Sequence, residues 1–518
     1  MSKNTARKCW NLISGVVLLL LLAAESLLLY RIWSLNMLPQ MYFMILAGAM
    51  LLATGLISLL LFQGRKSKKK GHGKRIIGYL LVALIVGLCM YAQNAVNQVL
   101  GTINAITVPN KVNVVLEIYV RADETVDSFR GVEDCVLAFP EDMAPEAVNQ
   151  ISGQLEDMLG CSVTPKLYPH ITKQVDALFS GEADVAVLDS AYLSILETME
   201  AYADFDQKAR LLQDQVIEKE VPTEPDAAET EPPREFDVTQ DSFLVYISGS
   251  DSRYTMLSSG RSDVNILVAV NPQDHQILLI NTPRDCYVVN PAGGEEAWDK
   301  LTHCSVRGVE NSVVALENLY GVDIDYYARI NFSGLETLID AIGGVTIYSD
   351  KAFNAVGVVY INKGENHLNG AQALAFARER KRLQGGDRDR GKNQMKLIEG
   401  IVNELSAGNL LENYTDILES LKGMFATDLP ADKIGQLVQF QISQMPKWEM
   451  LSVSLTGDNG TDHCWASGDY AYVMYPHAHS VEHVRSLIEA VLAGEALSEE
   501  DLIVNPWQKA PRWGAFFH

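Results

Sequence analysis

Three long apolar stretches dominate the first hundred residues. They run roughly from Trp10 to Tyr30, from Met37 to Phe62 and from Ile76 to Val96. About twenty helical residues, which rise 1.5 Å each, cover the roughly 30 Å hydrocarbon core of a bilayer, and each stretch meets that length. A cleavable signal peptide would be followed by a small-residue cleavage pattern, and no such pattern follows the first stretch. The pattern predicts three transmembrane helices within residues 1–100.

Basic residues between the apolar stretches indicate their orientation. The loop GRKSKKKGHGKR, residues 64–75, holds seven lysines and arginines, and the N-terminus adds Lys3, Arg7 and Lys8. Basic loops stay in the cytoplasm. We therefore predict a multi-pass protein of the cell membrane whose large C-terminal ectodomain lies on the extracellular side.

Strand-like and helix-like patterns alternate beyond the membrane segments. Within residues 108–215, VNVVLEIYV, CVLAF and ADVAVLDS are typical of strands, and APEAVNQISGQLEDMLG is typical of an amphipathic helix that ends at Gly160. The pattern predicts a small extracellular α/β accessory domain, in which we identify no catalytic constellation. Residues 216–238, rich in Pro and Glu, are predicted to be an acidic linker.

The main domain is predicted at residues 239–495, before a C-terminal tail at 496–518. FLVYISGSDS and VNILVAVNPQDHQILLINTPRD supply its first strands. Helical patterns follow at Val313 to Tyr320, at Leu335 to Ile342 and at Ser480 to Leu492. Strands interleaved with helices predict an α/β (α+β) fold with a central mixed sheet covered by helices.

The charge distribution limits the ligands that this ectodomain can take. The chain carries a net charge of -23, yet residues 1–100 hold 11 basic residues and one acidic residue, so the remainder carries -33. A domain this acidic is a poor nucleic-acid binder, because such binders spread positive charge over a broad surface. We predict no nucleic-acid partner, and any anion site must be local. The 7 cysteines show no metal-ligand spacing and leave the disulfide pattern open.

One short segment concentrates positive charge. The stretch AFARERKRLQGGDRDRGKNQ, residues 375–394, contains Arg378, Arg380, Lys381, Arg382, Arg388, Arg390 and Lys392. Arginine holds phosphate oxygens through two parallel hydrogen bonds and stays charged. A solvated charged face is the alternative interpretation.

The spacing within this segment indicates its local structure. Arg378 and Arg380 would point apart on a helix but the same way on extended chain, so the helix is predicted to end near Ala377. Asp387, Arg390 and Gln394 follow at helical spacings of three and four. The segment is therefore predicted to run from a helix end through extended chain into a second helix.

Two aspartates flank the loop between the first two strands of the main domain. Asp251 follows the first strand and Asp263 opens the second. Two close carboxylates attract a hard divalent cation, and Mg²⁺ favours one or two carboxylates beside water and phosphate oxygens. Arg261 lies two residues before Asp263, and Arg284 lies in TPRD at the end of the next strand, where α/β sheets commonly place ligand sites. Asp residues that cap turns are the alternative interpretation.

Seven ordered segments carry a family resemblance. They are GSDSR, GRSDVNILVAVNP, NTPRD, DKLTH, NFSGLETLIDAIGGV, LNGAQALAFARER and GDRDRGKNQ. Together they resemble the LytR-CpsA-Psr family of extracellular wall-polymer attachment enzymes, and the three spans with an accessory domain resemble its capsule-attachment branch. The resemblance implies a phosphotransferase that joins an undecaprenyl-pyrophosphate-linked glycopolymer, capsular or teichoic-acid-like, to peptidoglycan with Mg²⁺, or Mn²⁺, assisting.

The resemblance also implies residue roles. Asp251 and Asp263 become the metal-associated pair; Arg261, Arg284, Arg378, Arg380 and Arg390 become pyrophosphate ligands; Gln394 and Asp387 support that cluster. Four residues depart from the family's usual pattern and affect local hydrogen bonding. Asn281 stands in place of the usual Ser before PRD, and the others are Cys286, Lys392 and Asn393. The family fold further implies an apolar pocket for the polyprenyl chain, although the helix faces around Leu316 or Leu338 would look the same in a packed core.

Two other functions fit the same residues. A polyprenyl-pyrophosphate pyrophosphatase would cleave the same bond with water as acceptor, and a non-catalytic lipid-phosphate-binding regulator of wall-polymer assembly would bind without turnover. In the transferase hypothesis, Asp263 or Asp251 accepts the proton of the attacking sugar hydroxyl.

Overall fold

The computed structural model describes residues 3–35, 37–62, 71–107, 111–196, 199–220, 236–250, 257, 259–383, 385–406 and 414–503. The chain forms two compact units. The first comprises residues 1–107 and 430–446, and the second comprises residues 108–429 and 447–518. Asp251 lies outside the described residues, as does most of the predicted linker at 216–238.

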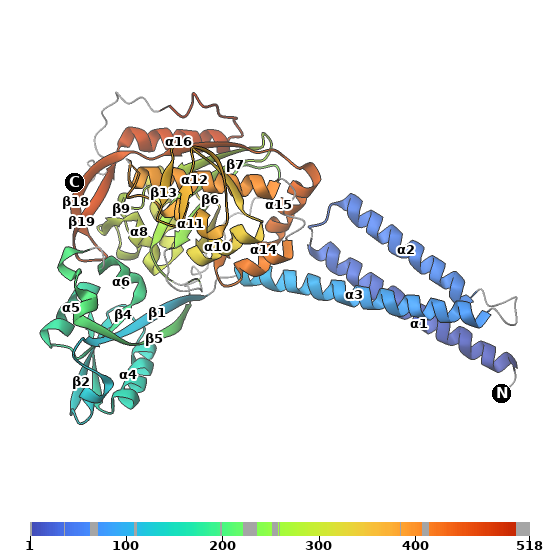
Figure 1. Cartoon of the computed structure of the whole chain (residues 1–518), viewed down its shortest axis with the longest axis horizontal. Coiled ribbons are helices and arrows are strands. Elements are labelled where there is room, and N and C mark those ends of the chain that lie inside the picture. The colour runs from blue at the N-terminus through green and yellow to red at the C-terminus, as the bar shows by residue number, and fades with distance from the viewer. Residues whose placement is uncertain are drawn as a thin grey trace. The chain divides into compact units, whose positions relative to one another are not determined.

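Three long helices form most of the first unit: α1 (Lys3–Leu35), α2 (Gln40–Phe62) and α3 (Gly71–Thr107). Each is long and apolar enough to cross a membrane, as predicted, and the three pack side by side (Figure 1). Glu25, the one acidic residue of this region, is buried and accepts hydrogen bonds of 2.8 Å from the Thr54 hydroxyl of α2. A buried carboxylate paired in this way serves helix packing.

A fourth helix belongs to the same unit although it lies far along the chain. Helix α15 (Ala431–Gln444) falls within the predicted main domain in sequence but groups with the membrane helices and contacts α3. The Gln439 side-chain amide donates to the Leu38 carbonyl oxygen at 3.4 Å. The hydrophobic pattern of α15 alone did not indicate this grouping.

The second unit begins with a five-stranded sheet in the order β3-β2-β4-β1-β5. Strand β2 pairs in parallel with β3 and β4, whereas β1 pairs antiparallel with β4 and β5. Side chains alternate between two buried clusters because successive strand residues face opposite sides. The strands are β1 (Lys111–Arg121), β2 (Asp134–Pro140), β3 (Ser162–Tyr168), β4 (Val185–Asp189) and β5 (Ala209–Glu220).

Helices cover both faces of this sheet. Helix α4 (Pro145–Leu159) buries Val148, Ile151 and Leu155 on one face and ends at Gly160, whose left-handed φ of 69° suits glycine. The other face is covered by α5 (Ile171–Ser180), α6 (Ser190–Leu196) and α7 (Phe205–Lys208). The small α/β accessory fold predicted from the sequence is confirmed.

The rest of the second unit is built on a six-stranded mixed sheet of order β16-β11-β6-β7-β8-β17. Strands β6 and β11 are parallel, as are β8 and β17, and the remaining pairs are antiparallel. The strands are β6 (Phe243–Ser250), β7 (Ser262–Asn271), β8 (Gln276–Asn281), β11 (Tyr326–Asn331), β16 (Phe425–Thr427) and β17 (Glu449–Ser454). This mixed sheet with helices confirms the predicted α/β fold class.

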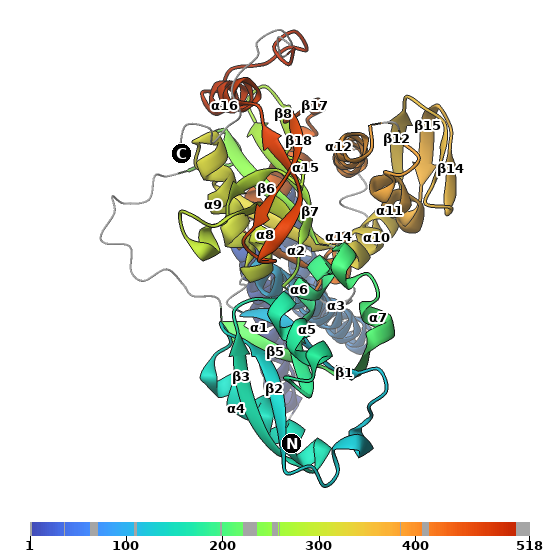
Figure 2. The same cartoon turned by 90° about the vertical axis from the view of Figure 1, so that its left-hand side faces the viewer.

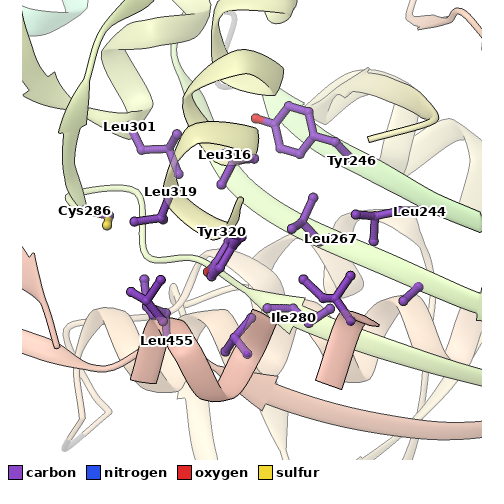
Figure 3. Close-up of a cluster of buried hydrophobic side chains, with 14 of the residues drawn as sticks. Leu244, Tyr246, Leu267, Ile280, Cys286, Leu301, Leu316, Leu319, Tyr320 and Leu455 are labelled. Atoms are coloured by element: carbon purple, nitrogen blue, oxygen red, sulfur yellow. The ribbon is translucent and has the colours of Figure 1, made fainter. Parts of the chain in front are cut away.

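The largest hydrophobic core packs helices against this sheet. Helices α9 (Val309–Tyr320) and α16 (Ala478–Leu492) bury their apolar faces here. Figure 3 shows Leu316, Leu319 and Tyr320 of α9 in one buried cluster with Leu267 and Ile280 of the sheet. These α9 side chains, which the sequence left open to a lipid pocket or a core, lie in the packed core.

A smaller lobe stands beside the sheet and holds a separate core. It combines α10 (Phe332–Ala341), α11 (Gly370–Arg378) and the antiparallel pair of β12 (Val345–Ser349) and β15 (Gly364–Leu368). Helix α12 (Asp387–Glu404) contacts both β12 and strands β8 and β17, and Figure 2 shows it between the lobe and the sheet. The basic segment 375–394 therefore joins two packed parts of the molecule.

Candidate functional site

The site begins at an ion pair between neighbouring strand ends. Asp263 lies at the start of β7, and Arg284 follows the end of β8. Antiparallel pairing aligns Ile266 with Asn281, which brings these two ends together. Arg284 Nη1 lies 2.8 Å from Asp263 Oδ1, and both side chains are largely buried, at 13% and 14% exposed. The Thr302 hydroxyl also reaches Asp263 Oδ1, at 3.5 Å.

A second carboxylate and a lysine extend the pair. Asp285 Oδ2 lies 3.7 Å from Arg284 Nε, and its Oδ1 lies 3.3 Å from Lys300 Nζ. Lys300 ends β10 (Trp298–Lys300), and Thr302 lies in the adjoining α8 (Leu301–Cys304). The sequence analysis assigned no role to Asp285, Lys300 or Thr302. Their signal was present in the NTPRD and DKLTH segments, where only Arg284 was given a function.

Helix α12 adds the third part of the cluster. Arg390 is buried and lies 2.6 Å from Asp387 one turn earlier, so the predicted spacing does bring the two side chains together. Gly391 allows α12 to approach β8 closely, since a Cβ atom there would lie 2.3 Å from Asn281 Nδ2. Asn281, which stands where the resembled family usually has Ser, therefore faces a glycine on α12.

Burial and the charges of the cluster shift the pKa values of two of its aspartates. Burial raises the pKa of Asp263, but the charges of Arg284, Arg261 and Arg390 outweigh burial and hold that pKa below its ordinary value. Burial keeps the pKa of Asp387 above its ordinary value despite Arg390 and Arg284, and the carboxylates of Asp285 and Asp263 add to the rise. These mutual effects place Arg261 and Arg390 in the same electrostatic environment as the Asp263–Arg284 pair.

One buried donor of the cluster is available to an anion. Among the described residues, Arg261, Arg284, Lys300 and Arg390 share the site with the carboxylates of Asp263, Asp285 and Asp387. Burial lowers the pKa of Arg390, and the charges of Arg284 and Arg380 lower it further. Within the described part of the chain, the buried Arg284 Nε–H has no hydrogen-bond acceptor. A phosphate oxygen would supply both the acceptor and the negative charge.

The arginines at the end of α11 lie in a different environment. The helix ends at Arg378, one residue beyond the predicted end, and Glu379 follows in extended conformation. The Glu379 carboxylate is buried and accepts hydrogen bonds from the Val356 and Arg382 backbone amides. Arg378, the last residue of α11, and Arg380 are both exposed, whereas Glu379 between them is buried.

The two exposed arginines differ in their surroundings. The Arg378 guanidinium lies 4.9 Å from the centre of the Phe332 ring. Arg380 acts on the cluster through its charge near Arg390. The Gln394 side-chain amide donates to the Ala377 carbonyl oxygen at 3.5 Å, so it holds the end of α11.

One group of buried side chains has the composition of a metal site. Among the described residues, ligand atoms of Asp299, His303 and Cys464 lie within 4.8 Å of one another. The Asp299 carboxylate already accepts hydrogen bonds from the Lys300 and Ala466 backbone amides and contacts His303 Nδ1 at 2.6 Å. We therefore interpret this group as a hydrogen-bonded centre that fixes β10 and the turn at Ala466.

These elements define a mixed α/β protein with helices able to cross a membrane and a buried arginine–aspartate cluster that can take an anion. The profile of the LytR_cpsA_psr family matches residues 207–484, more than half of the chain. The chain therefore belongs to the LytR-CpsA-Psr family.

Two relatives are named polyisoprenyl-teichoic acid–peptidoglycan teichoic acid transferase TagU. The protein of Enterococcus faecalis is 35% identical over 191 residues, which are 37% of this chain and 61% of the relative. The protein of Bacillus anthracis is 30% identical over 230 residues, which are 44% of this chain and 73% of the relative. The chain thus spans less than two thirds of the first relative's length.

Solved structures of similar proteins also match. The Lin1025 protein of Listeria innocua is 27% identical, covers 49% of this chain and 99% of its own, and gives a TM-score of 0.41. A TagT structure described as carrying octaprenyl pyrophosphate lipid is 25% identical, covers 51% of this chain and 95% of its own, and gives a TM-score of 0.39.

Proposed function

We propose that this chain is a membrane-anchored phosphotransferase that moves a glycopolymer from a polyprenyl-pyrophosphate carrier to peptidoglycan on the extracellular side. The buried cluster around the Asp263–Arg284 pair carries the proposal, because its arginines and the Arg284 Nε–H without an acceptor suit a pyrophosphate. The family relatives named as teichoic acid transferases support the same class of reaction. Both teichoic-acid-like and capsular polymers are candidate substrates.

The proposed reaction exchanges one phosphorus–oxygen bond for another. An acceptor sugar hydroxyl forms a bond to the phosphorus that carries the polymer, and the bond from that phosphorus to the bridging oxygen breaks. Polyprenyl phosphate leaves with the electron pair, and the hydroxyl proton passes to a base. Positioning and charge neutralisation dominate such transfers, so Arg284, Arg261 and Arg390 would stabilise the charge on the departing phosphate.

Asp263 is a poor candidate for the base that accepts the hydroxyl proton. A general base works best when its pKa lies near the operating pH. The arginines hold the pKa of Asp263 below its ordinary value, and Asp263 Oδ1 already pairs with Arg284. We propose that Asp263 positions Arg284 and that Asp251, the other carboxylate predicted from sequence, takes the proton.

We also propose Mg²⁺ as the cofactor, with Asp263 and Asp251 as its protein ligands. Burial raises the pKa of Asp387, and the nearby carboxylates of Asp285 and Asp263 add to the rise, so a divalent cation would relieve the repulsion among these carboxylates. When bound, Mg²⁺ would neutralise pyrophosphate charge. The test is the binding of Mn²⁺ with inorganic pyrophosphate to the full chain, followed by electron paramagnetic resonance.

Asp263→Asn is expected to weaken Mn²⁺ binding about tenfold and to lower turnover by roughly a hundred- to thousandfold. Asp350→Asn, whose carboxylate is 72% exposed and pairs with Lys396, is the control and should leave both unchanged. Wild-type Mn²⁺ affinity in Asp263→Asn would remove Asp263 from the ligand set.

The function is tested with the purified full chain in detergent, a polyprenyl-pyrophosphate-linked sugar, Mg²⁺ and a peptidoglycan oligomer, and the products are read by mass spectrometry. A phosphodiester-linked sugar–peptidoglycan product is expected. Release of free sugar phosphate whether or not the oligomer is present would instead identify a pyrophosphatase. Stoichiometric binding without turnover would identify a regulator.

A further inference from the structure

A hollow of about 400 Å³, a volume that includes space open to solvent, lies within the second unit. The accessory sheet and its helices supply one wall and the main domain supplies the other. Its lining includes aromatic rings and charged groups: Tyr168, His170, Tyr192, Trp465, Asp142, Asp189 and Arg307. Sites for small molecules often lie between domains and mix apolar walls with a few polar groups.

Contacts between the two parts hold these walls in place. The Thr172 hydroxyl of α5 donates to the Ser467 carbonyl oxygen at 3.2 Å. Ala191 and Ile195 of α6 share a buried cluster with Val306 and Ala466 of the main domain. The hollow is therefore bounded by packed elements, and a ligand would meet a preformed site.

Arg307 links the two walls directly. Its Nε donates to the Tyr192 hydroxyl at 2.8 Å, and its Nη2 lies 3.2 Å from Asp142 Oδ2. The guanidinium also lies 4.8 Å from the centre of the Trp465 ring. The position of the Trp465 ring is fixed further by Gly293, where a Cβ atom would lie 2.5 Å from the ring.

The chemistry of the hollow differs from that of the arginine cluster. Two carboxylates, Asp142 and Asp189, accompany one guanidinium, so a phosphate group is disfavoured here. Carboxylate and guanidinium groups instead suit the many hydroxyl donors and acceptors of a sugar, while aromatic rings offer apolar surface to its C–H faces. We propose that this hollow binds a pyranose unit of a glycan.

One segment joins the hollow to the arginine cluster. Lys300 and Thr302 contact Asp285 and Asp263 in the cluster, and Arg307 follows on the adjoining 3₁₀ helix η5 (Ser305–Arg307). Asp299, next to Lys300, accepts a hydrogen bond from the Ala466 amide at 2.9 Å, and Trp465 N–H donates to the Trp298 carbonyl oxygen. This geometry assigns the hollow to a sugar of either the lipid-linked polymer or the peptidoglycan acceptor, an inference that rests on the proposed function.

Calorimetry on the full chain in nanodiscs tests the inference with two probes. The first is a peptide-free tetrasaccharide of alternating N-acetylglucosamine and N-acetylmuramic acid, which represents the acceptor. The second is a polyprenyl-pyrophosphate-linked disaccharide, which represents the donor. Trp465→Ala should weaken binding of at least one probe about tenfold, as loss of a buried aromatic contact does.

Two further variants keep the test decisive if Trp465→Ala folds poorly. Asp142→Asn preserves shape and should weaken the same probe several-fold, whereas Tyr470→Ala, at a tyrosine that is 68% exposed and outside the hollow, should change binding less than twofold. Equal binding by wild type, Trp465→Ala and Asp142→Asn, or no binding of either probe, would overturn the sugar site. Sugar-free polyprenyl phosphate separates the two proposals: its failure to bind wild type counts against the arginine cluster, not the hollow.

Discussion

Two aspartates of the same cluster have pKa values shifted in opposite directions. Asp263 faces Arg284, Arg261 and Arg390, and their charges outweigh the cost of burial. Asp387 pairs with Arg390 at 2.6 Å, but burial and the nearby carboxylates of Asp285 and Asp263 dominate. Asp263 is therefore stabilised as a carboxylate, whereas ionised Asp387 opposes folding of the protein without ligand.

The shift at Asp387 predicts a pH-dependent effect of Asp387→Asn. A raised pKa in the folded state means that the stabilising contribution of Asp387 is complete below its unfolded pKa and is lost as pH rises through the folded pKa. Asp387→Asn has no carboxylate to ionise at this position, so it keeps this stability as pH rises. Its melting temperature should exceed that of wild type by on the order of 2 °C at pH 7.5 and match it near pH 4.

Thermal melts of the full chain in detergent, without ligand, check this expectation. The pKa shift of Asp263 has the opposite sign, but it is present in both wild type and Asp387→Asn. Its effect on the melting temperature therefore cancels when the two proteins are compared. A variant that is less stable than wild type at pH 7.5 would show that the pairing of Asp387 with Arg390 outweighs burial.

Sequence spacing could predict the aspartate and arginine positions but not all of their partners. The helical interval between Asp387 and Arg390 encodes their contact directly. Asp285 and Lys300 meet because β10 pairs antiparallel with β9 (Tyr287–Val289), which sets Lys300 opposite Tyr287, and no local pattern carries that information. The role of Arg378 in pyrophosphate binding stays a prediction.

Helix α12 presents Arg390 to the sheet through one close contact. Gly391 faces Asn281 at the end of β8, and a methyl group there would lie 2.3 Å from Asn281 Nδ2 and 2.7 Å from Cγ. The contact between Gly391 and Asn281 therefore sets how close α12 lies to the end of β8, three residues before Arg284. A substitution at Gly391 or Asn281 should move Arg390 relative to Arg284.

Gly391→Ala should therefore destabilise the protein by about 1–3 kcal/mol, the usual cost of overpacking a buried contact. The double variant Asn281→Ser/Gly391→Ala should recover most of that loss, because the shorter side chain makes room for the methyl group. Denaturation of both variants measures the recovery. Independent, additive losses would show that the contact with Asn281 is not the cause.

Element boundaries were predictable where capping residues mark them. Gly160 ends α4 as expected, and α11 ends at Arg378 within one residue of the prediction. Helix α9 begins at Val309, four residues before the predicted Val313, because Glu310 and Asn311 lie outside the apolar pattern although their backbone is helical. Apolar periodicity locates the packed part of a helix better than its polar first turn.

Hydropathy could predict the architecture of the whole chain, but not how distant segments group. The three apolar helices and the two α/β parts follow from local patterns. The grouping of α15 with α1, α2 and α3 depends on contacts between segments hundreds of residues apart. The hollow around Arg307 likewise needs two separately folded walls.

The positive-inside pattern predicts which parts of the chain a protease can reach. The basic loop at 64–75 should remain protected in intact protoplasts, while cleavage within the acidic linker at 216–238 should separate the N-terminal and C-terminal tags onto two fragments on a denaturing gel. Immunoblotting with tags at both chain ends reads the fragments. A linker protected until the membrane is permeabilised would reverse the orientation.

Binding of a polyprenyl phosphate to Arg390→Lys tests the account most directly. Lysine keeps the charge but loses the planar fork, so a buried ligand of the phosphate should bind at least about tenfold more weakly. Lys392→Ala, at a side chain 63% exposed on the same helix, is the matched control and should stay within about twofold of wild type. Both variants are melted to verify folding. Equal, small losses in the two variants would contradict a pyrophosphate site at the arginine–aspartate cluster.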